Sequence, residues 1–311
     1  MRSPTPLLVA AVLLGRFASA QVVFHDDAGK ELVAKDARIE VLASELKFTE
    51  GPVWIGAQRR LVFSDIPASK LLRWTEDEGV QDFLASEQAN GNTLDLAGRL
   101  LSCQHGARNV VRREPEDAVS VIASRFDEKL LNSPNDLAVR MDGTVWFTDP
   151  SYGLGKREAE QPLRGVYCVA PTDGTVSLVQ KDFDQPNGIC FSPDHASVWI
   201  ADSGKHQRIG RFPIGEDGTL GEPLFWIPGG ADGIRCDAHG NLWAAQRAGI
   251  GVFSPDGKPL VSIAVEPSPT NCAFGGADGR TLFVTARTKL LRIAVLVGAA
   301  AIPAREDGEK R

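Results

Sequence analysis

The chain has 311 residues, of which 43% are hydrophobic and 24% charged, and it contains 31 Gly and 19 Pro. This composition is typical of a folded globular protein that turns often, and it argues against a largely disordered chain. The formal net charge is −6, and no cluster of Lys and Arg with interleaved aromatic residues occurs. Both features argue against a nucleic-acid partner.

The first twenty residues differ in character from the rest of the chain. Arg2 precedes an apolar run over residues 7–14, and the small residues 18–20 follow. This pattern predicts a signal peptide over residues 1–20 that is cleaved after Ala20, so we expect export to the periplasm or secretion. The apolar run is too short to span a bilayer, and we expect no membrane span. A disordered N-terminus is the alternative.

One pattern is repeated six times through the rest of the chain. In each copy a polar residue opens a short apolar strand, a turn such as Asp142-Gly143 reverses the chain, and a second apolar strand returns. The openings lie 42, 43, 52, 45 and 39 residues apart, the length of one four-stranded propeller blade. They are Glu50, Asn92, Asn135, Asn187, Asp232 and Asn271. Because no segment between them shows helical periodicity, we predict an all-β protein, a six-bladed β-propeller over residues 21–297.

Three further segments bear on the limits of this domain. Residues 37–44 alternate well enough to form a strand, which we expect to complete the last blade beside residues 290–296. Residues 156–162 are a polar excursion in the longest interval, which predicts an extended surface loop at the mouth of the channel. Residues 298–311 end in a charged run and predict a mobile C-terminal tail.

The five cysteines are an odd number, so at least one thiol is unpaired within the chain. Their spacings fit no zinc motif, and each lies among apolar neighbours in an expected strand. We therefore predict buried free thiols at Cys103, Cys168, Cys190, Cys236 and Cys272.

The six opening residues converge on one face of the channel, because the first strand of each blade lines the central axis. All six are carboxylates or carboxamides, although the folding of a blade requires neither at this place. A buried ring of this kind is unfavourable unless a cation satisfies it. Oxygen ligands without His or Cys favour calcium over zinc. For each residue taken singly, a turn or strand-capping role is the alternative.

The second strand of each hairpin returns to the same face, so its end also borders the expected site. Asp149 and Asp202 occupy matching places in two blades, which favours a structural role in binding backbone groups at the strand exit. His105 follows a strand, and contact with substrate and a structural role are both open for it. The bordering residues are Asp65, Gln104, His105, Asp149, Tyr152, Asp202 and Arg247.

Five short motifs occur in order at blade spacing: Glu50-Gly-Pro-Val-Trp, Leu131-Asn-Ser-Pro-Asn-Asp-Leu, Phe147-Thr-Asp-Pro-Ser-Tyr-Gly-Leu, Pro186-Asn-Gly and Ala231-Asp-Gly. Over nearly all of the mature chain, this set resembles the gluconolactonase, regucalcin and luciferin-regenerating enzyme family. The resemblance implies a six-bladed propeller with one divalent metal held by a Glu, two Asn and an Asp. On the matching motifs these are Glu50, Asn135, Asn187 and Asp232.

The segment through Asn135 is most similar to the bacterial gluconolactonase branch of this family. Animal members carry an Arg where this chain has Ser133, so substrate contacts made by that Arg do not transfer. The specific lactone is therefore not fixed by the resemblance.

The resemblance implies metal-assisted hydrolysis of a small sugar lactone. The metal, calcium in first place with zinc, magnesium and manganese as alternatives, would act as a Lewis acid at the lactone carbonyl. Asp232 would be the catalytic base that activates water. We expect His105, Arg108, Tyr152 and Asn92 to bind substrate. The chain has no Gly-x-Ser-x-Gly motif of the kind that carries a serine nucleophile.

Two alternatives to this function are open at the level of the sequence. Related propellers hydrolyse aryl esters or organophosphates, and neither fold nor metal separates these substrates from lactones. An exported propeller that binds a sugar or a protein, with a purely structural calcium, is the non-catalytic alternative. The sequence makes no prediction of the oligomeric state.

Overall fold

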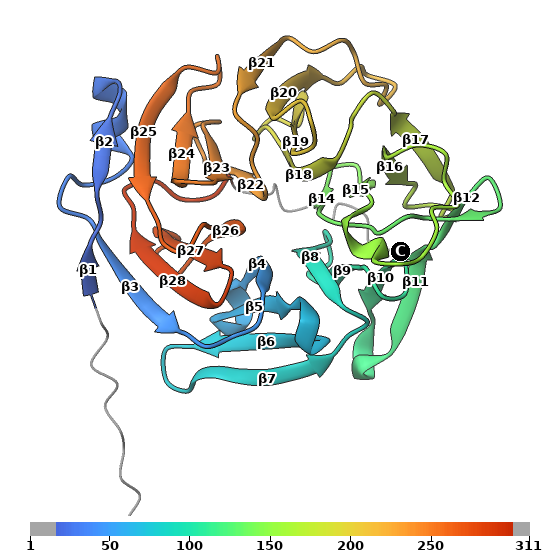
Figure 1. The fold of residues 1–311 in the computed structure, drawn as a ribbon, viewed down its shortest axis with the longest axis horizontal. Coiled ribbons are helices and arrows are strands. Elements are labelled where there is room, and N and C mark those ends of the chain that lie inside the picture. The colour runs from blue at the N-terminus through green and yellow to red at the C-terminus, as the bar shows by residue number, and fades with distance from the viewer. Residues whose placement is uncertain (1–16, 301–311) are drawn as a thin grey trace, which may run out of the picture.

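Six antiparallel β-sheets stand around a central axis in the computed structural model, which describes residues 17–300 (Figure 1). Each sheet is one blade of a propeller, with its first strand nearest the axis and its later strands farther out. The predicted all-β, six-bladed propeller is therefore confirmed.

Blades 1, 2 and 3 each consist of four consecutive strands. Blade 1 contains β4 (Thr49–Ile55), β5 (Arg60–Asp65), β6 (Lys70–Thr75) and β7 (Gly79–Ala85). Blade 2 contains β8 (Ala89–Leu94), β9 (Leu100–Gln104), β10 (Asn109–Arg113) and β11 (Val119–Ala123). Blade 3 contains β14 (Leu137–Val139), β15 (Val145–Asp149), β16 (Gly165–Val169) and β17 (Val176–Gln180). Between blades 2 and 3 the chain forms a small hairpin of β12 (Arg125–Phe126) and β13 (Lys129–Leu130).

Blades 4 and 5 repeat this order, whereas blade 6 takes its fourth strand from the N-terminal part of the chain. Blade 4 contains β18 (Pro186–Phe191), β19 (Ser197–Asp202), β20 (Arg208–Pro213) and β21 (Phe225–Pro228). Blade 5 contains β22 (Ile234–Cys236), β23 (Leu242–Gln246), β24 (Gly249–Phe253) and β25 (Pro259–Ala264). Blade 6 contains β26 (Asn271–Gly275), β27 (Thr281–Ala286), β28 (Lys289–Ala294) and β3 (Arg38–Ala43).

The propeller closes where β3 pairs with β28, with Val41 opposite Leu291. This pairing confirms the predicted contact between residues 37–44 and residues 290–296. Blade 6 thus contains strands from both ends of the chain, and the ring of blades is held shut by backbone hydrogen bonds.

The two ends of the described chain lie on blades 5 and 6. β1 (Phe17–Ser19) pairs with the free edge of β3, and β2 (Val22–Phe24) pairs with β25. Cleavage after Ala20, as predicted from the sequence, would remove β1 and leave blade 6 with four strands. At the other end, Ala299 forms a β-bridge with blade 5, so the predicted tail begins in contact with the propeller. Residues 301–311 lie outside the described residues.

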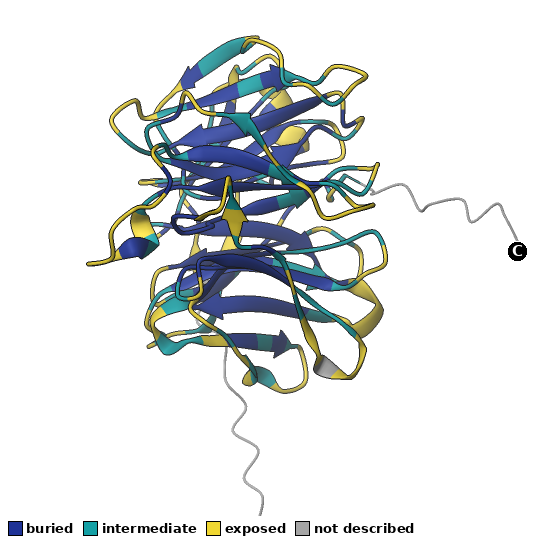
Figure 2. Cartoon of the chain, turned by 90° about the vertical axis from the view of Figure 1, so that its right-hand side faces the viewer, coloured by how far each residue is buried: buried dark blue, intermediate teal, exposed yellow. Residues whose placement is uncertain are grey.

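The hydrophobic core is divided into clusters, several of which join neighbouring blades. The second strands carry the largest buried side chains, among them Trp146, Trp199 and Trp243. Between blades 6 and 1, Trp54 stacks on Phe283 with ring centroids 5.4 Å apart. Figure 2 shows buried strands between exposed loops at both faces of the propeller. Because the blades cover one another's apolar faces, polar residues of the inner strands are left facing the axis.

Helical structure within residues 17–300 is limited to short 3₁₀ segments, in line with the absence of helical periodicity in the sequence. None of the described helices is long and apolar enough to cross a membrane. The segments are η1 (Asp27–Glu31), η2 (Gly56–Gln58), η3 (Ile66–Ala68), η4 (Pro115–Asp117) and η5 (Tyr152–Leu154).

The five cysteines are all free thiols. The prediction of burial is confirmed for Cys103, Cys190, Cys236 and Cys272, whereas Cys168 on β16 is partly exposed. Burial raises the pKa of Cys272 to about 12, so this thiol stays protonated and packs as a small apolar side chain.

Candidate active site

A cavity of about 590 Å³ opens at one face of the propeller and is lined by residues from all six blades. The four predicted metal ligands, Glu50, Asn135, Asn187 and Asp232, all line it. Glu50 is only 4% exposed, and Asn135 and Asn187 are each 6% exposed, so they lie deep in the cavity. Asp232 is partly exposed to it. The fold therefore brings together four oxygen-bearing side chains from blades 1, 3, 4 and 5.

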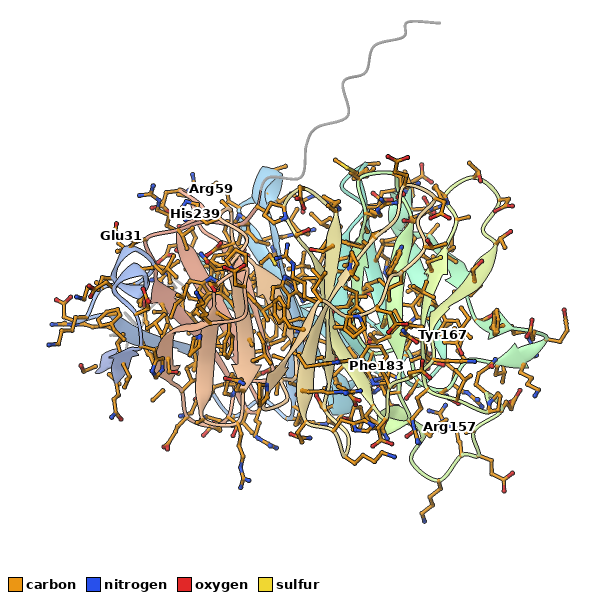
Figure 3. All side chains as sticks on the ribbon, turned by 90° about the horizontal axis from the view of Figure 1, so that it is seen from above. Glu31, Arg59, Arg157, Tyr167, Phe183 and His239 are labelled. Atoms are coloured by element: carbon orange, nitrogen blue, oxygen red, sulfur yellow. The ribbon has the colours of Figure 1, made fainter. Side chains whose placement is uncertain are left out.

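The cavity is on the face that carries the long loop between β15 and β16. Arg157 fixes this loop to the rim, because its guanidinium donates to the backbone carbonyls of His105 and Gly106. Figure 3 shows Arg157 on the face opposite to Arg59 and His239, which lie in turns between first and second strands. The predicted surface loop therefore contacts the cavity rim through Arg157, whereas none of residues 156–162 lines the cavity itself.

The pairing between first and second strands is irregular next to the predicted ligands, at the end of the first strand that faces the cavity. The pairing of β4 with β5 shifts register after Glu50, and that of β18 with β19 shifts around Asn187. In blade 5, Asp232 N donates to Ala245 O while Ala245 N donates to Gly233 O, so two residues oppose one. A bulge of this kind re-aims a side chain and ends regular pairing.

A glycine follows three of the four ligands because neighbouring inner strands approach closely at this level. Gly188 N donates to Asp232 O at 3.0 Å, and a Cβ on Gly188 would lie 2.4 Å from that oxygen. The strands that carry Asn187 and Asp232 can therefore approach this closely only if residue 188 has no side chain.

We expect Gly188→Ala to destabilise the protein by about 1–3 kcal/mol, the usual cost of overpacking, and to weaken cation binding because it separates Asn187 from Asp232. Urea unfolding and a calcium titration measure the two effects. Gly56→Ala is the matched control, because its added Cβ would meet only Trp54 Nε1 at 3.8 Å. Equal stability of the two variants would contradict the proposed close contact.

The structure corrects two members of the predicted polar ring. In blade 2 the residue of the first strand that lines the cavity is Asn90, whereas Asn92 lines a separate cavity of about 240 Å³. Asn92 Nδ2 donates to Gly51 O and Ser64 Oγ, both at 2.8 Å, and its Oδ1 accepts from Ser102 Oγ at 2.6 Å. Its side-chain amide is engaged in structural hydrogen bonds, so the prediction that Asn92 binds substrate is wrong.

Asn271 is the second ring member that does not line the cavity. Its Nδ2 donates to Glu50 Oε2 at 3.1 Å, and its Oδ1 accepts from Cys272 N at 2.9 Å. Asn271 therefore supports the Glu50 carboxylate from below instead of facing the cavity.

A buried ion pair beneath the predicted ligands was not predicted from the sequence. Arg235 Nη1 lies 3.0 Å from Asp136 Oδ2 and links blade 5 to blade 3. Asn271 Nδ2 lies 3.4 Å from the same oxygen, which joins the pair to Glu50. Together with Asp232, the group contains three carboxylates and one guanidinium. When ionised it carries two net negative charges, which match a divalent cation.

Burial and mutual repulsion raise the pKa values of the two carboxylates that face the cavity. Burial, followed by repulsion from Asp232 and Asp136, raises the pKa of Glu50 well above its usual range. Burial also raises the pKa of Asp232 to about 7, although a hydrogen bond from Asn187 opposes this shift. Carboxylates crowded in this way favour a bound cation, which would restore their charged forms.

The donor set fits a hard divalent cation. It offers two carboxylates and two amides, and the Asn135 side chain makes no hydrogen bond to another described residue. Calcium takes six to eight oxygen ligands, so such a set leaves positions for water and substrate. Within residues 17–300, no group of three or more His, Cys, Asp or Glu is placed to hold a metal. The site combines carboxylates with amides instead.

The remaining predicted substrate contacts have different places. His105 and Tyr152 line the cavity, with Tyr152 46% exposed. His105 Nε2 lies 3.0 Å from Asn90 Nδ2, and since an amide nitrogen only donates, the ring nitrogen accepts. Arg108 does not line the cavity, because its Nε donates to Leu131 O at 2.6 Å beneath the surface. The prediction that Arg108 binds substrate is therefore corrected to a structural role.

His105 is a buried neutral imidazole, because burial and, to a lesser extent, the Arg157 charge lower its pKa to about 4. The unfolded chain protonates this residue near pH 6.5. Stability due to the neutral ring is therefore complete above that pH and is lost as pH falls toward 4.

Between pH 7 and pH 5 we expect the native protein to lose about 2 kcal/mol more unfolding free energy than His105→Gln. Urea unfolding of both proteins at the two pH values measures this difference. The same loss of unfolding free energy in both proteins would show that His105 is protonated in the folded state at pH 5.

Three acidic residues at strand exits have a shared structural role, as predicted for Asp149 and Asp202. Asp149 accepts from the backbone N–H groups of Asn132 and Ser133, both at 2.7 Å. Asp202 binds the matching amides of residues 184 and 185, and Asp65 binds those of residues 47 and 48. These carboxylates hold the segment that leads into the first strand of their blade, and so position the ligand that follows.

Comparison with known proteins places the chain in a family. Residues 48–288 match the family model described as the SMP-30/Gluconolactonase/LRE-like region. A gluconolactonase from Zymomonas mobilis is 32% identical over 291 residues, which cover 82% of this chain and 80% of that protein. A pentonolactonase from Haloferax volcanii is 27% identical over 260 residues, or 79% of this chain and 83% of that protein.

A solved structure shows the same arrangement of blades. The gluconolactonase from Xanthomonas campestris superposes with a TM-score of 0.83 at 31% identity, covering 90% of this chain and 95% of that one. With the family model matching most of its length, the chain belongs to the SMP-30/gluconolactonase/LRE-like family.

Proposed function

We propose that the protein is an exported lactonase that hydrolyses a sugar lactone with the help of one divalent cation, calcium, held by Glu50, Asn135, Asn187 and Asp232. The observation that carries this proposal is the convergence of these four side chains from four blades in one cavity of about 590 Å³. A cavity of this volume accommodates a single sugar ring. Membership of the family and the gluconolactonase relatives support lactone hydrolysis.

The bound cation would supply Lewis-acid stabilisation of the negative charge that develops on the lactone carbonyl oxygen. Asp232 acts as the general base: its carboxylate accepts a proton from the water whose oxygen attacks the carbonyl carbon. The tetrahedral centre then collapses, the ring C–O bond breaks, and the proton held by Asp232 passes to the leaving ring oxygen. The product is an open-chain hydroxy acid, and the carboxylate of Asp232 is regenerated.

Two neutral side chains at the cavity wall orient the sugar. Burial raises the pKa of Tyr152 to about 12, so its hydroxyl remains a hydrogen-bond donor across the physiological range. His105 is held by Asn90 and by packing of Gly153 against its ring. Because neither group changes charge between pH 5 and pH 8, their hydrogen bonds to substrate persist over that range.

The purified mature protein tests this proposal in a pH-stat assay with glucono-1,5-lactone, phenyl acetate and a phosphotriester. We expect lactone hydrolysis that EDTA abolishes and calcium restores, with magnesium, manganese and zinc compared in the same add-back series. Hydrolysis of only the ester or only the phosphotriester would show that the enzyme acts on another substrate class. A protein that chelation destabilises but that cleaves none of the three would be the non-catalytic binding propeller.

Export is the remaining part of the proposal, and the N-terminal sequence pattern supports it. Mass spectrometry of the protein recovered from outside the cytoplasm should show a chain that begins at Gln21. Recovery of the uncleaved chain from the cytoplasm alone would contradict export.

A further inference from the structure

A groove of about 600 Å³ adjoins the active-site cavity between blades 5 and 6. The two hollows share Arg247, Ser268 and Arg287, so the groove extends the cavity toward the edge of the propeller. Lys289 and Glu266 also line the groove. We call the part lined by Arg247, Arg287 and Lys289 the basic annex.

The acidic and basic residues that line the cavity and the annex lie in different places. In the cavity, the acidic lining residues are Glu50 and Asp232, both assigned to the cation. The basic lining residues are Arg247 and Arg287, and the annex adds Lys289 against a single acid, Glu266. Once a divalent cation neutralises the two ligand carboxylates, the accessible surface is therefore positive on the side of blades 5 and 6.

The charges of the annex are not paired within the described part of the fold. Within residues 17–300, none of the three forms an ion pair, and both arginines are exposed. Arg287 lies over the Phe48 ring at 5.8 Å from the centroid, which leaves the edge of its guanidinium free to donate hydrogen bonds. The charge of Arg287 also acts on the nearby Asp232 carboxylate. Three cations without an ion-pair partner beside a cavity nevertheless favour an anionic ligand.

The backbone holds these residues in place while their side chains remain free. Arg287 O accepts from Thr49 N at 2.6 Å, which fixes the end of β27 to blade 1. Arg247 O accepts from Ser268 Oγ at 2.8 Å. Both residues line the cavity as well as the annex, so each guanidinium is placed where it can bind an oxyanion in a bidentate manner.

We propose that the basic annex binds an anionic oxyacid group carried by the substrate, so that the preferred substrate is an anionic sugar lactone. This inference rests on the proposed lactonase function and names its substrate class. The lactone ring would lie over the cation ligands, and the phosphate, sulfonate or carboxylate substituent would reach Arg247, Arg287 and Lys289. A neutral lactone would leave these three cations without a partner.

The test compares kcat/KM for 6-phosphoglucono-1,5-lactone with that for glucono-1,5-lactone, using the calcium-loaded protein at low ionic strength. We expect the anionic lactone to be preferred at least about tenfold, mainly through KM, and the preference to shrink as salt is added. In Arg287→Gln the ratio of the two kcat/KM values should fall about tenfold, with a smaller fall in Lys289→Gln. Lys258→Gln, an exposed lysine outside both hollows, is the matched control and should keep the native ratio.

Calorimetry with 6-phosphogluconate and gluconate gives a readout that does not depend on turnover. We expect 6-phosphogluconate to bind at least about tenfold more tightly, and Arg287→Gln to remove the difference. An annex that instead holds the carboxylate of every product would lose both ligands equally in this variant, which would overturn the inference. So would equal kcat/KM values for the two lactones in the native protein.

Failure of the inference and failure of the proposed function are separable in this design. If glucono-1,5-lactone is hydrolysed and the variants leave the ratio unchanged, the lactonase stands and the annex does not bind substrate. If neither lactone is cleaved while 6-phosphogluconate binds through Arg287, the lactonase function is wrong and the anion site stands.

Discussion

Replacement of Asp232 by Asn is expected to lower kcat for lactone hydrolysis by about 10²–10⁴-fold, the usual contribution of a positioned general base. An Asn keeps an oxygen toward the cation but cannot accept a proton from water. The loss should therefore persist at saturating calcium. Initial rates measured over a calcium titration, with bound calcium determined in the same samples, separate the loss of base from the loss of ligand.

Asn187→Ala is the matched control for Asp232→Asn. Both residues line the cavity and are linked by a hydrogen bond, but Asn187 has no proton-accepting role. Its removal should weaken calcium binding, and raising the calcium concentration should restore most of kcat. If Asp232→Asn binds calcium and turns over at the native rate, Asp232 is not the base.

Arg235→Leu should be the most destabilising of these substitutions, at about 3–5 kcal/mol, because it leaves the Asp136 carboxylate buried without its partner. The Asp136 side chain is 2% exposed and that of Arg235 18%. Urea unfolding in EDTA measures the effect without contribution from bound cation. The double variant Asp136→Asn with Arg235→Leu should recover most of the loss, because no unpaired charge remains.

Arg73→Leu is the control for Arg235→Leu. Arg73 pairs with Glu78 at 2.9 Å, but the two side chains are 32% and 52% exposed, and such pairs contribute less than about 1 kcal/mol. If Arg235→Leu costs no more than Arg73→Leu, the pair beneath the ligands does not stabilise the channel.

The blade architecture was predictable because each repeat carries its own pattern of strand, turn and strand. Closure of the ring was also predictable, since residues 37–44 form a strand with no partner in blade 1. Blade spacing gave six polar positions, and the resemblance to the gluconolactonase family selected Glu50, Asn135, Asn187 and Asp232 among them as the predicted ligands. Their grouping in one cavity is confirmed, while their binding of calcium stays a prediction.

The positions of Asn92 and Asn271 were not predictable from blade spacing alone. In the first strand of blade 2, Asn92 fits the repeat as well as Asn90, the residue two places earlier that lines the cavity. A better signal is the glycine that follows three of the four predicted ligands and marks the close approach of neighbouring strands; Asn135 is the exception. Asn90-Gly91 carries this signal in blade 2, whereas Asn92 is followed by Thr93.

The ion pair beneath the ligands and the basic annex depend on contacts between blades. Asp136 and Arg235 are 99 residues apart, and only the ring geometry joins them. The sequence did contain a signal, since Arg235 interrupts an apolar strand and Asp136 stands where blades 1, 4 and 5 carry glycine. The sequence pattern indicates that such residues need partners, but the partner is set by the packing of the blades.

The proposed function depends most directly on calcium binding by the four converging side chains. Equilibrium dialysis of the mature protein against calcium, alongside Glu50→Ala and Asn135→Ala, tests this binding. We expect one ion per chain in the native protein and at least about tenfold weaker binding in each variant. No bound calcium in the native protein, or unchanged affinity in both variants, would contradict the proposed function.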